Sequence, residues 1–166
     1  AGFPDGFKTT ITSWAAYSFL NAAAVVIQEQ LKQIGIDAEL MLLETATMIQ
    51  DVHTPGQENY DMAVTGTSGH IDPNQLVVNF QTGAGGNTTG YSNPQVDELI
   101  GEGATTTDQA ARREIYLQIQ EILLEDLPWV NLFVANQYEA MRNNVKGYTH
   151  IPTGSNIAFR ETWIEA

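Results

Sequence analysis

A chain of 166 residues, 43% of them hydrophobic, can form one compact domain with its own core. Its 20 acidic and 7 basic residues give a net charge of −13, which argues against binding to nucleic acid or anionic lipid, although such a charge could steer a cationic ligand. The absence of cysteine excludes disulfides, thiolate metal sites and cysteine nucleophiles. No apolar run approaches the roughly 20 residues of a membrane span. The first residues do not resemble a signal peptide, so we expect the numbering to begin inside a longer protein.

The first part of the sequence alternates between strand and helix patterns. Residues 7–12 alternate apolar and polar side chains and are predicted to form a strand. Apolar residues at spacings of three and four predict a helix over residues 17–34, and Gly35 is suited to end it. Residues 36–43 alternate again. Strand, helix and strand in this order predict a right-handed βαβ unit with parallel strands.

The next segment contains a third predicted strand, over residues 61–66. Short helices are expected before and after it, at residues 45–48 and 74–81. A tight polar segment, residues 66–73, begins where the third strand ends. Together these elements predict the α/β class, with an open mixed sheet flanked by helices.

Residues 87–133 carry the clearest structural signals. Ser92 and Asn93 are typical helix N-cap residues, and Pro94 suits a first helical turn. Asp108 is expected to cap a second helix. The apolar stripe of that helix consists of Ile115, Ile119, Ile122 and Leu123.

The sequence after the second of these helices indicates strands and then irregular chain. Pro128 is expected to stop the helix, residues 129–135 to form a strand and residues 137–142 to pair with it. Residues 147–158 are expected to be irregular. The last large apolar side chains need a surface to bury against. They are Phe159, Trp163 and Ile164.

The candidate ligand contacts follow from the predicted sheet. In open α/β sheets, ligands bind at the carboxyl ends of the parallel strands, here residues 12–14, 43–45 and 66–73. Glycines in the third segment would let a ligand approach the backbone, and its polar side chains could point the same way. Two aromatic residues could stack on a ligand, although core packing explains each equally well. These candidates are Trp14, Thr67, Ser68, Gly69, His70, Asp72 and Tyr91.

Ser68, His70 and Asp72 could also be proposed as a catalytic triad. Same-side positions on a strand lie about 6.5 Å apart, which places the three groups in a row instead of converging them. No Gly-x-Ser-x-Gly elbow is present, and contacts to turn backbone explain Ser68 and Asp72 more simply. His53, His70 and His150 lie far apart in sequence and lack ligand spacing, so we expect neither a metal site nor a cofactor.

Several motifs, taken in order, resemble one protein family. They are Gly2-Phe-Pro-Asp-Gly-Phe7, Leu31-Lys-Gln-Ile-Gly-Ile-Asp37, Tyr60-Asp-Met62, Asp72-Pro73, Asn87-x-x-Gly-Tyr-Ser-Asn-Pro-x-Val-Asp-Glu-Leu-Ile100, Asp108 with Arg113 and Tyr116, Glu125-Asp-x-Pro-Trp129, Asn144-Val-Lys-Gly-Tyr148, Phe159 and Trp163. This set resembles the family 5 extracytoplasmic solute-binding proteins of peptide- and nickel-type ABC importers. The match covers nearly the whole chain.

The resemblance implies a part of a two-lobe protein. Residues 1–166 would be a single domain, the C-terminal second lobe, and the first lobe would be absent from the chain. The family implies a non-enzymatic function in which a small solute bound between the lobes drives hinge closure. It implies ABC permease subunits as partners and a periplasmic or extracytoplasmic location, with a signal or lipid anchor upstream of Ala1.

The third strand end departs from the pattern of the peptide-binding members. They carry Gly-Trp-x-x-Asp there, and the Asp accepts the α-amino group of the peptide. Here Gly66 matches, Thr67 stands at the Trp position and His70 at the Asp position, with Ser68 and Gly69 between them. A neutral imidazole pairs with an ammonium more weakly than a carboxylate does, and a protonated one repels it. The departure favours a ligand with an acceptor or anionic group over a simple free-amine peptide.

Two functions of other classes remain as alternatives. The same fold could serve as a protein-interaction or sensor module. Apolar area that a first lobe would normally cover could then contact a partner, and it could also make the isolated lobe self-associate. A small serine hydrolase would need Ser68 as its nucleophile and His70 as its base. Loss of ester hydrolysis on Ser68→Ala would distinguish the hydrolase from both binding functions.

Overall fold

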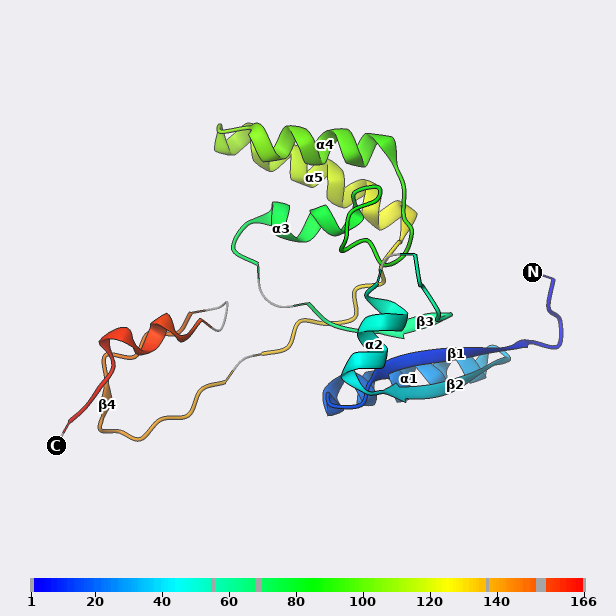
Figure 1. Ribbon diagram of the computed structural model, residues 1–166, viewed down its shortest axis with the longest axis horizontal. Coiled ribbons are helices and arrows are strands. Elements are labelled where there is room, and N and C mark those ends of the chain that lie inside the picture. The colour runs from blue at the N-terminus through cyan, green and yellow to red at the C-terminus, as the bar shows by residue number, and fades with distance from the viewer. Residues whose placement is uncertain (1, 55, 68–69, 137, 152–154, 166) are drawn as a thin grey trace.

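The computed structural model describes residues 2–54, 56–67, 70–136, 138–151 and 155–165. They form a sheet half, a helical half and an extended C-terminal region (Figure 1). The combination of helices with parallel strands confirms the predicted α/β class. Within the described residues, no helix has both the length and the apolar character needed to cross a membrane.

The sheet half consists of β1 (Phe7–Trp14), α1 (Ser18–Gln33), β2 (Ile36–Leu43), α2 (Thr45–Val52) and β3 (Met62–Val64). Strands β1 and β2 run parallel along their full length, with Phe7 opposite Ile36 and Trp14 opposite Leu43. Strand β3 pairs with the other side of β1, also parallel, which gives the order β2-β1-β3. The parallel pairing predicted for the βαβ unit is therefore confirmed.

Helix α1 packs on the sheet through its apolar stripe. The buried residues of this core are Ile11, Leu20, Ala24, Ala38 and Val64. After α1, Gly35 has a φ of 83°, as expected for a residue that ends a helix. A Cβ atom at Gly6 would lie 1.8 Å from the carbonyl oxygen of Gly35, so the chain before β1 can approach the α1–β2 turn only with glycine there.

The helical half consists of α3 (Pro73–Val77), the 3-10 helix η1 (Val78–Phe80), α4 (Pro94–Thr105) and α5 (Gln109–Asp126). The side chains of Asp72, Asn93 and Asp108 accept hydrogen bonds from backbone N–H groups at the starts of α3, α4 and α5. Of the two residues expected to cap α4, only Asn93 does so. The Ser92 hydroxyl lies instead 3.1 Å from that of Thr82.

The core of the helical half lies among α3, η1, α4 and α5. Both α4 and α5 turn apolar stripes toward it, and the predicted stripe of α5 contributes two buried isoleucines. Partly buried side chains, among them Ile122 and Leu123, pack around its edge. The buried members are Val77, Phe80, Val96, Leu99, Ile100, Ile115, Tyr116 and Ile119.

The chain after α5 differs most from the predictions. Leu127 adopts a left-handed φ of 48° and ends α5 just before Pro128. The strands predicted at residues 129–135 and 137–142 are wrong: the described residues of both ranges pair with no other strand, so no ladder of hydrogen bonds forms. A small antiparallel pair and a 3-10 helix form further along. They are β4 (Val145–Lys146), η2 (Asn156–Glu161) and β5 (Trp163–Ile164).

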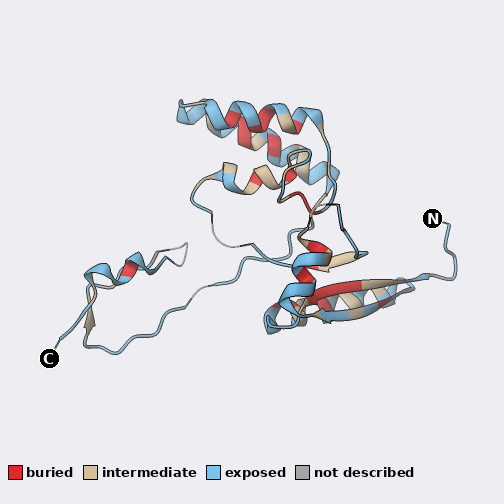
Figure 2. Cartoon of the chain, viewed as in Figure 1, coloured by how far each residue is buried: buried red, intermediate tan, exposed pale blue. Residues whose placement is uncertain are grey.

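The C-terminal region leaves large apolar side chains in solvent. Val134 is 96% exposed, and the three side chains that the sequence marks as needing cover, Phe159, Trp163 and Ile164, are exposed as well. Figure 2 shows this region almost entirely in the colour of exposed residues, in contrast with the buried positions on α4, α5 and β1. Apolar surface of this extent is typical of a face that packs against another part of a protein.

Candidate functional site

Four side chains gather where β1 and β3 end, and we call Trp14, Tyr17, His53 and Thr65 the strand-end cluster. Trp14 is the last residue of β1, Thr65 follows β3, and His53 follows α2. Nε1 of Trp14 donates a hydrogen bond to Oγ1 of Thr65 at 3.2 Å. The rings of Trp14 and His53 lie 5.5 Å apart at an angle of 32°. Segments distant in sequence therefore meet at the carboxyl edge of the sheet, where open α/β sheets bind ligands.

The hydroxyl of Thr65 links Trp14 to His53. Oγ1 of Thr65 lies 3.4 Å from Nε2 of His53. Because this hydroxyl accepts the Trp14 N–H, its own hydrogen can be donated to Nε2 when that nitrogen is unprotonated. Burial lowers the pKa of His53 below its usual value of 6.5, which favours the neutral ring. The His53 ring of the strand-end cluster is therefore favoured in its uncharged form near neutral pH.

Aromatic rings continue from the strand-end cluster onto the start of α1. Trp14 and Tyr17 meet edge to face, with centroids 5.8 Å apart, and Tyr17 and Phe19 lie 6.0 Å apart. Trp14 is half-buried, whereas Tyr17 and Phe19 are exposed. This arrangement presents apolar ring surface with hydrogen-bonding edges, which suits contact with a planar polar group.

The polar segment after β3 is described in part. Oγ1 of Thr67 lies 2.9 Å from Nε2 of His70, and both residues are exposed. The candidates Ser68 and Gly69 lie outside the described residues, so their contacts stay predictions. Thr67 and His70 are thus brought together beyond the strand end, where they can meet a ligand.

The carboxylate of Asp72 is engaged within the protein. Its Oδ1 accepts hydrogen bonds from Nη2 of Arg112 at 2.7 Å and from the backbone N–H of Asn74 at 2.8 Å. The bond from Arg112, and then that from Asn74, holds the pKa of Asp72 below its usual value. Asp72 therefore fixes the start of α3, and a ligand would have to compete with Arg112 for this carboxylate.

Arg112 joins the three main helices of the helical half. Its Nε donates to the carbonyl oxygen of Gly103 on α4 at 2.8 Å, and its Nη2 also donates to Oη of Tyr116 at 2.9 Å. Tyr116 in turn donates to Oδ1 of Asn74 on α3 at 3.3 Å. These contacts anchor the C-terminal end of the polar segment to α5.

Tyr91 contacts the helical half. Its hydroxyl donates to Oδ2 of Asp126 at 2.5 Å, and its ring meets that of Phe80 edge to face at 6.3 Å. Burial, followed by the bond to Asp126, raises the pKa of Tyr91 to about 12. Within the described part of the chain, these contacts do not reach Trp14. The structure therefore does not bring the two aromatic candidates into contact.

The known proteins that this chain resembles are binding proteins. No protein-family model matches it. It is 29% identical over 143 residues to the oligopeptide-binding protein AppA of Bacillus subtilis, covering 85% of this chain and 26% of AppA. It is 28% identical over 162 residues to the glutathione-binding protein GsiB of Escherichia coli, covering 92% of this chain and 31% of GsiB.

Solved structures agree with the sequence comparison. AppA of Bacillus subtilis in complex with a nonapeptide superposes with a TM-score of 0.83 at 28% identity, over 96% of this chain and 32% of AppA. The periplasmic binding protein DppA of Helicobacter pylori, in complex with the peptide STSA, gives a TM-score of 0.74 at 25% identity over 99% of this chain and 32% of DppA.

The homologues and structural neighbours of this chain are family 5 solute-binding proteins of ABC importers. The resemblance carried by the sequence motifs is thereby confirmed, and so is the periplasmic-binding-protein fold. These relatives are binding proteins, not enzymes. The chain spans only 26% and 31% of the length of AppA and GsiB.

Sequence reasoning missed three members of the strand-end cluster. Thr65 could have been found as a residue at the predicted end of β3, and Tyr17 as the aromatic residue three positions after Trp14. His53 gave no local signal, because its approach to Trp14 depends on how α2 packs beside β1. The histidines have different settings: His150 lies 3.0 Å from Oε1 of Glu139. The described residues contain no group of three or more metal-ligating side chains.

Proposed function

We propose that this chain is the C-terminal second lobe of a two-lobe solute-binding protein that delivers its solute to an ABC permease outside the cytoplasm. Residues 1–166 would form one domain of that protein, and a first lobe would supply the other side of the ligand site. The observation that carries the proposal is the superposition of 96% of the chain on peptide-bound AppA with a TM-score of 0.83. A solute that contacts both lobes would drive closure of the hinge between them.

We infer that the solute is peptide-like. AppA and DppA are solved with peptides, and GsiB is a glutathione-binding protein. The strand-end cluster offers matching chemistry, because aromatic rings can stack on planar amide groups while Thr65, Thr67 and His70 can exchange hydrogen bonds with them. Since Arg112 already engages Asp72, this lobe is better suited to neutral amide groups than to an α-ammonium group.

An apolar groove supports the idea that another part of the longer protein covers this chain. The groove encloses about 390 Å³ between α1 and the chain after α5. Its lining contains no charged residue, and the large side chains at its rim are exposed. The lining residues are Phe19, Ala22, Ala23, Val26, Ile27, Gln30, Leu132 and Phe133.

In the isolated chain, a second copy would take the place of the missing part on this groove. We therefore expect light scattering to give a mass above the 18.2 kDa of one chain as concentration rises. Val26→Lys would place a charge in the groove and return the chain to a monomer. A chain that stays monomeric at every concentration would contradict the covered groove.

The proposed site can be tested in the longer two-lobe protein. Trp14→Ala should weaken binding of a nonapeptide by about tenfold in calorimetry, because its ring surface is lost. His70→Ala should weaken binding by more than about twofold, through loss of a hydrogen bond. Trp163→Ala, in β5, is the matched control and should leave affinity unchanged. Unchanged affinity in both site variants would remove the strand-end cluster and His70 from the ligand site.

A further inference from the structure

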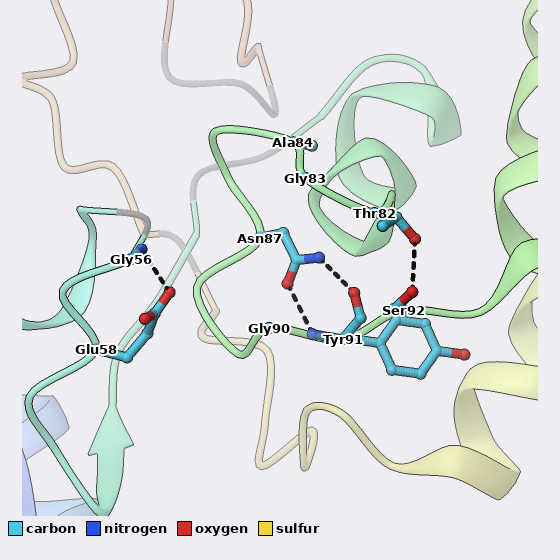
Figure 3. A pocket seen from close by; sticks show the side chains of 9 residues that line it. All are labelled: Gly56, Glu58, Thr82, Gly83, Ala84, Asn87, Gly90, Tyr91 and Ser92. Atoms are coloured by element: carbon cyan, nitrogen blue, oxygen red, sulfur yellow. Dashed lines mark hydrogen bonds between the residues drawn. The ribbon is translucent and has the colours of Figure 1, made fainter.

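A second cavity lies apart from the strand-end cluster. It encloses about 200 Å³ between the loop that follows α2 and the loop that leads into α4 (Figure 3). Of the candidates that the sequence singled out, only Tyr91 belongs to it. The lining residues are Gly56, Glu58, Thr82, Gly83, Ala84, Asn87, Gly90, Tyr91 and Ser92.

The loop into α4 is held in shape by the buried side chain of Asn87. Its Nδ2 donates to the carbonyl oxygens of Gln81 at 3.0 Å and Tyr91 at 2.7 Å, and its Oδ1 accepts from the N–H of Tyr91 at 3.2 Å. The hydroxyl of Tyr60, just after the other loop, donates to the carbonyl oxygen of Thr88 at 2.6 Å. The two walls of the cavity are therefore fixed to each other before any ligand arrives.

Glu58 gives the cavity its charge. The backbone N–H of Gly56 donates to Oε1 of Glu58 at 2.9 Å, and this bond lowers the pKa of the carboxyl, which keeps it ionised at neutral pH. No Lys, Arg or His is among the lining residues. A negative wall without a positive partner favours a cationic guest, and the net charge of −13 would attract one.

Two further carboxylates stand behind the opposite wall. Oδ1 of Asp97 accepts from the backbone N–H of Thr82 at 2.8 Å, and Asp126 accepts the hydroxyl of Tyr91. Tyr91 is one of the lining residues, and with a pKa of about 12 it keeps its proton, so its ring stays neutral. A neutral aromatic ring attracts a cation over its face, and the paired hydroxyls of Thr82 and Ser92, 3.1 Å apart, supply acceptor oxygens.

We propose that this cavity binds an alkylammonium group, held by Glu58, the ring of Tyr91 and the hydroxyls of Thr82 and Ser92. The guest would be a small organic cation or the amino group of a larger solute. A divalent metal fits the site less well, because the described residues offer no cluster of three ligating side chains and Glu58 is the one carboxylate in the lining. The proposal does not depend on the transport function.

The test is a titration of the ¹⁵N-labelled 166-residue chain with n-butylammonium chloride, followed by amide chemical shifts at constant ionic strength. We expect saturable shifts at Gly56, Glu58, Thr82, Gly90 and Tyr91. The uncharged n-butanol and the anionic butyrate should give no saturable shifts there. Equal shifts with n-butanol would show that the cavity binds the alkyl chain without regard to charge, which would overturn the proposal. Absence of saturation with butylammonium would overturn it as well.

Glu58→Gln isolates the charge, because the amide oxygen of Gln can still accept the bond from Gly56. It should weaken butylammonium binding by about fivefold, the upper range for an exposed ion pair. Glu98→Gln, an exposed position on α4, removes the same charge elsewhere and should change binding less than about twofold. Equal weakening in both variants would mean that the cation responds only to net charge, which would also overturn the proposal.

Discussion

Ile119 in α5 and Ile164 in β5 are the same residue type in two regions with opposite surroundings. Ile119 is 0% exposed within the core of the helical half, whereas Ile164 is 73% exposed in the C-terminal region. The helical half supplies its own packing partners, because α4 and α5 lie against each other and α3 lies beside them (Figure 1). The C-terminal region is also rich in large apolar side chains, but beyond Trp129, which packs against Phe80, most of those that the structure describes stay exposed. Burial thus depends on the facing element as much as on the residue.

The largest expected effect comes from truncating these two isoleucines. Ile119→Ala should lower the free energy of unfolding by about 3 kcal/mol, because it removes buried methyl groups and leaves a cavity. Ile164→Ala should change it by less than about 0.5 kcal/mol, because no close packing is lost. Urea unfolding followed by circular dichroism measures both. A comparable loss in both variants would show that the C-terminal region is packed in solution and would break the comparison.

The stability of the helical half should also depend on pH, through the carboxylate of Asp72. Its pKa is lowered chiefly by the bond from Arg112, so its stabilising effect is present above the unfolded pKa, usually 3.8, and is lost as pH falls through the lower folded pKa. Asp72→Asn keeps a capping side chain but removes the charge. We expect the variant to unfold at lower urea than the parent at pH 7 and at nearly the same urea near pH 2.

A gap between parent and Asp72→Asn that is the same at pH 7 and near pH 2 would contradict the ion pair with Arg112. Arg112→Gln provides a second route to the same contact. It should remove the pH-dependent part of the effect of Asp72→Asn, because the two changes then act on one interaction. Independent effects of the two changes would separate Arg112 from Asp72.

The sequence predicted the helical half better than the other two regions. The caps Asn93 and Asp108 and the stripe around Ile119 are local signals, and each is confirmed by the contacts of α4 and α5. The strand predicted at residues 129–135 failed because a strand requires a partner, and partner choice is not encoded in local alternation. The apolar pattern was present, but nothing in the described chain pairs with it.

In the candidate site, too, local signals could be read from the sequence, whereas contacts between distant segments could not. Trp14 was found because the end of a parallel strand is readable from the pattern, whereas His53 reached it through packing between distant segments. Asp72 was singled out from the sequence as a ligand contact, but the structure pairs it with Arg112, which lies 40 residues away and gives no local signal. Ligand roles of Trp14, Thr67, Ser68, Gly69, His70, Asp72 and Tyr91 stay predictions.

The smallest effect concerns a polar group in the core of the sheet half. Ser13 is 0% exposed, and its Oγ has no hydrogen-bond partner among the described residues. Ser13→Ala should therefore raise the free energy of unfolding by up to about 1 kcal/mol, because a buried unsatisfied hydroxyl is removed with little change in shape. Urea unfolding measures the change. A clear loss of stability would show that the hydroxyl has a hydrogen-bond partner in solution.

The central claim, that this chain is one lobe of a two-lobe receptor, is tested most directly by calorimetry on two proteins. Glutathione and a mixed nonapeptide library would be titrated into the 166-residue chain and into the longer protein that contains it. The account predicts micromolar binding of a peptide-like probe by the longer protein and no detectable binding by the chain alone, which offers only part of the contacts. Micromolar binding by the chain alone, or none by the longer protein, would contradict it.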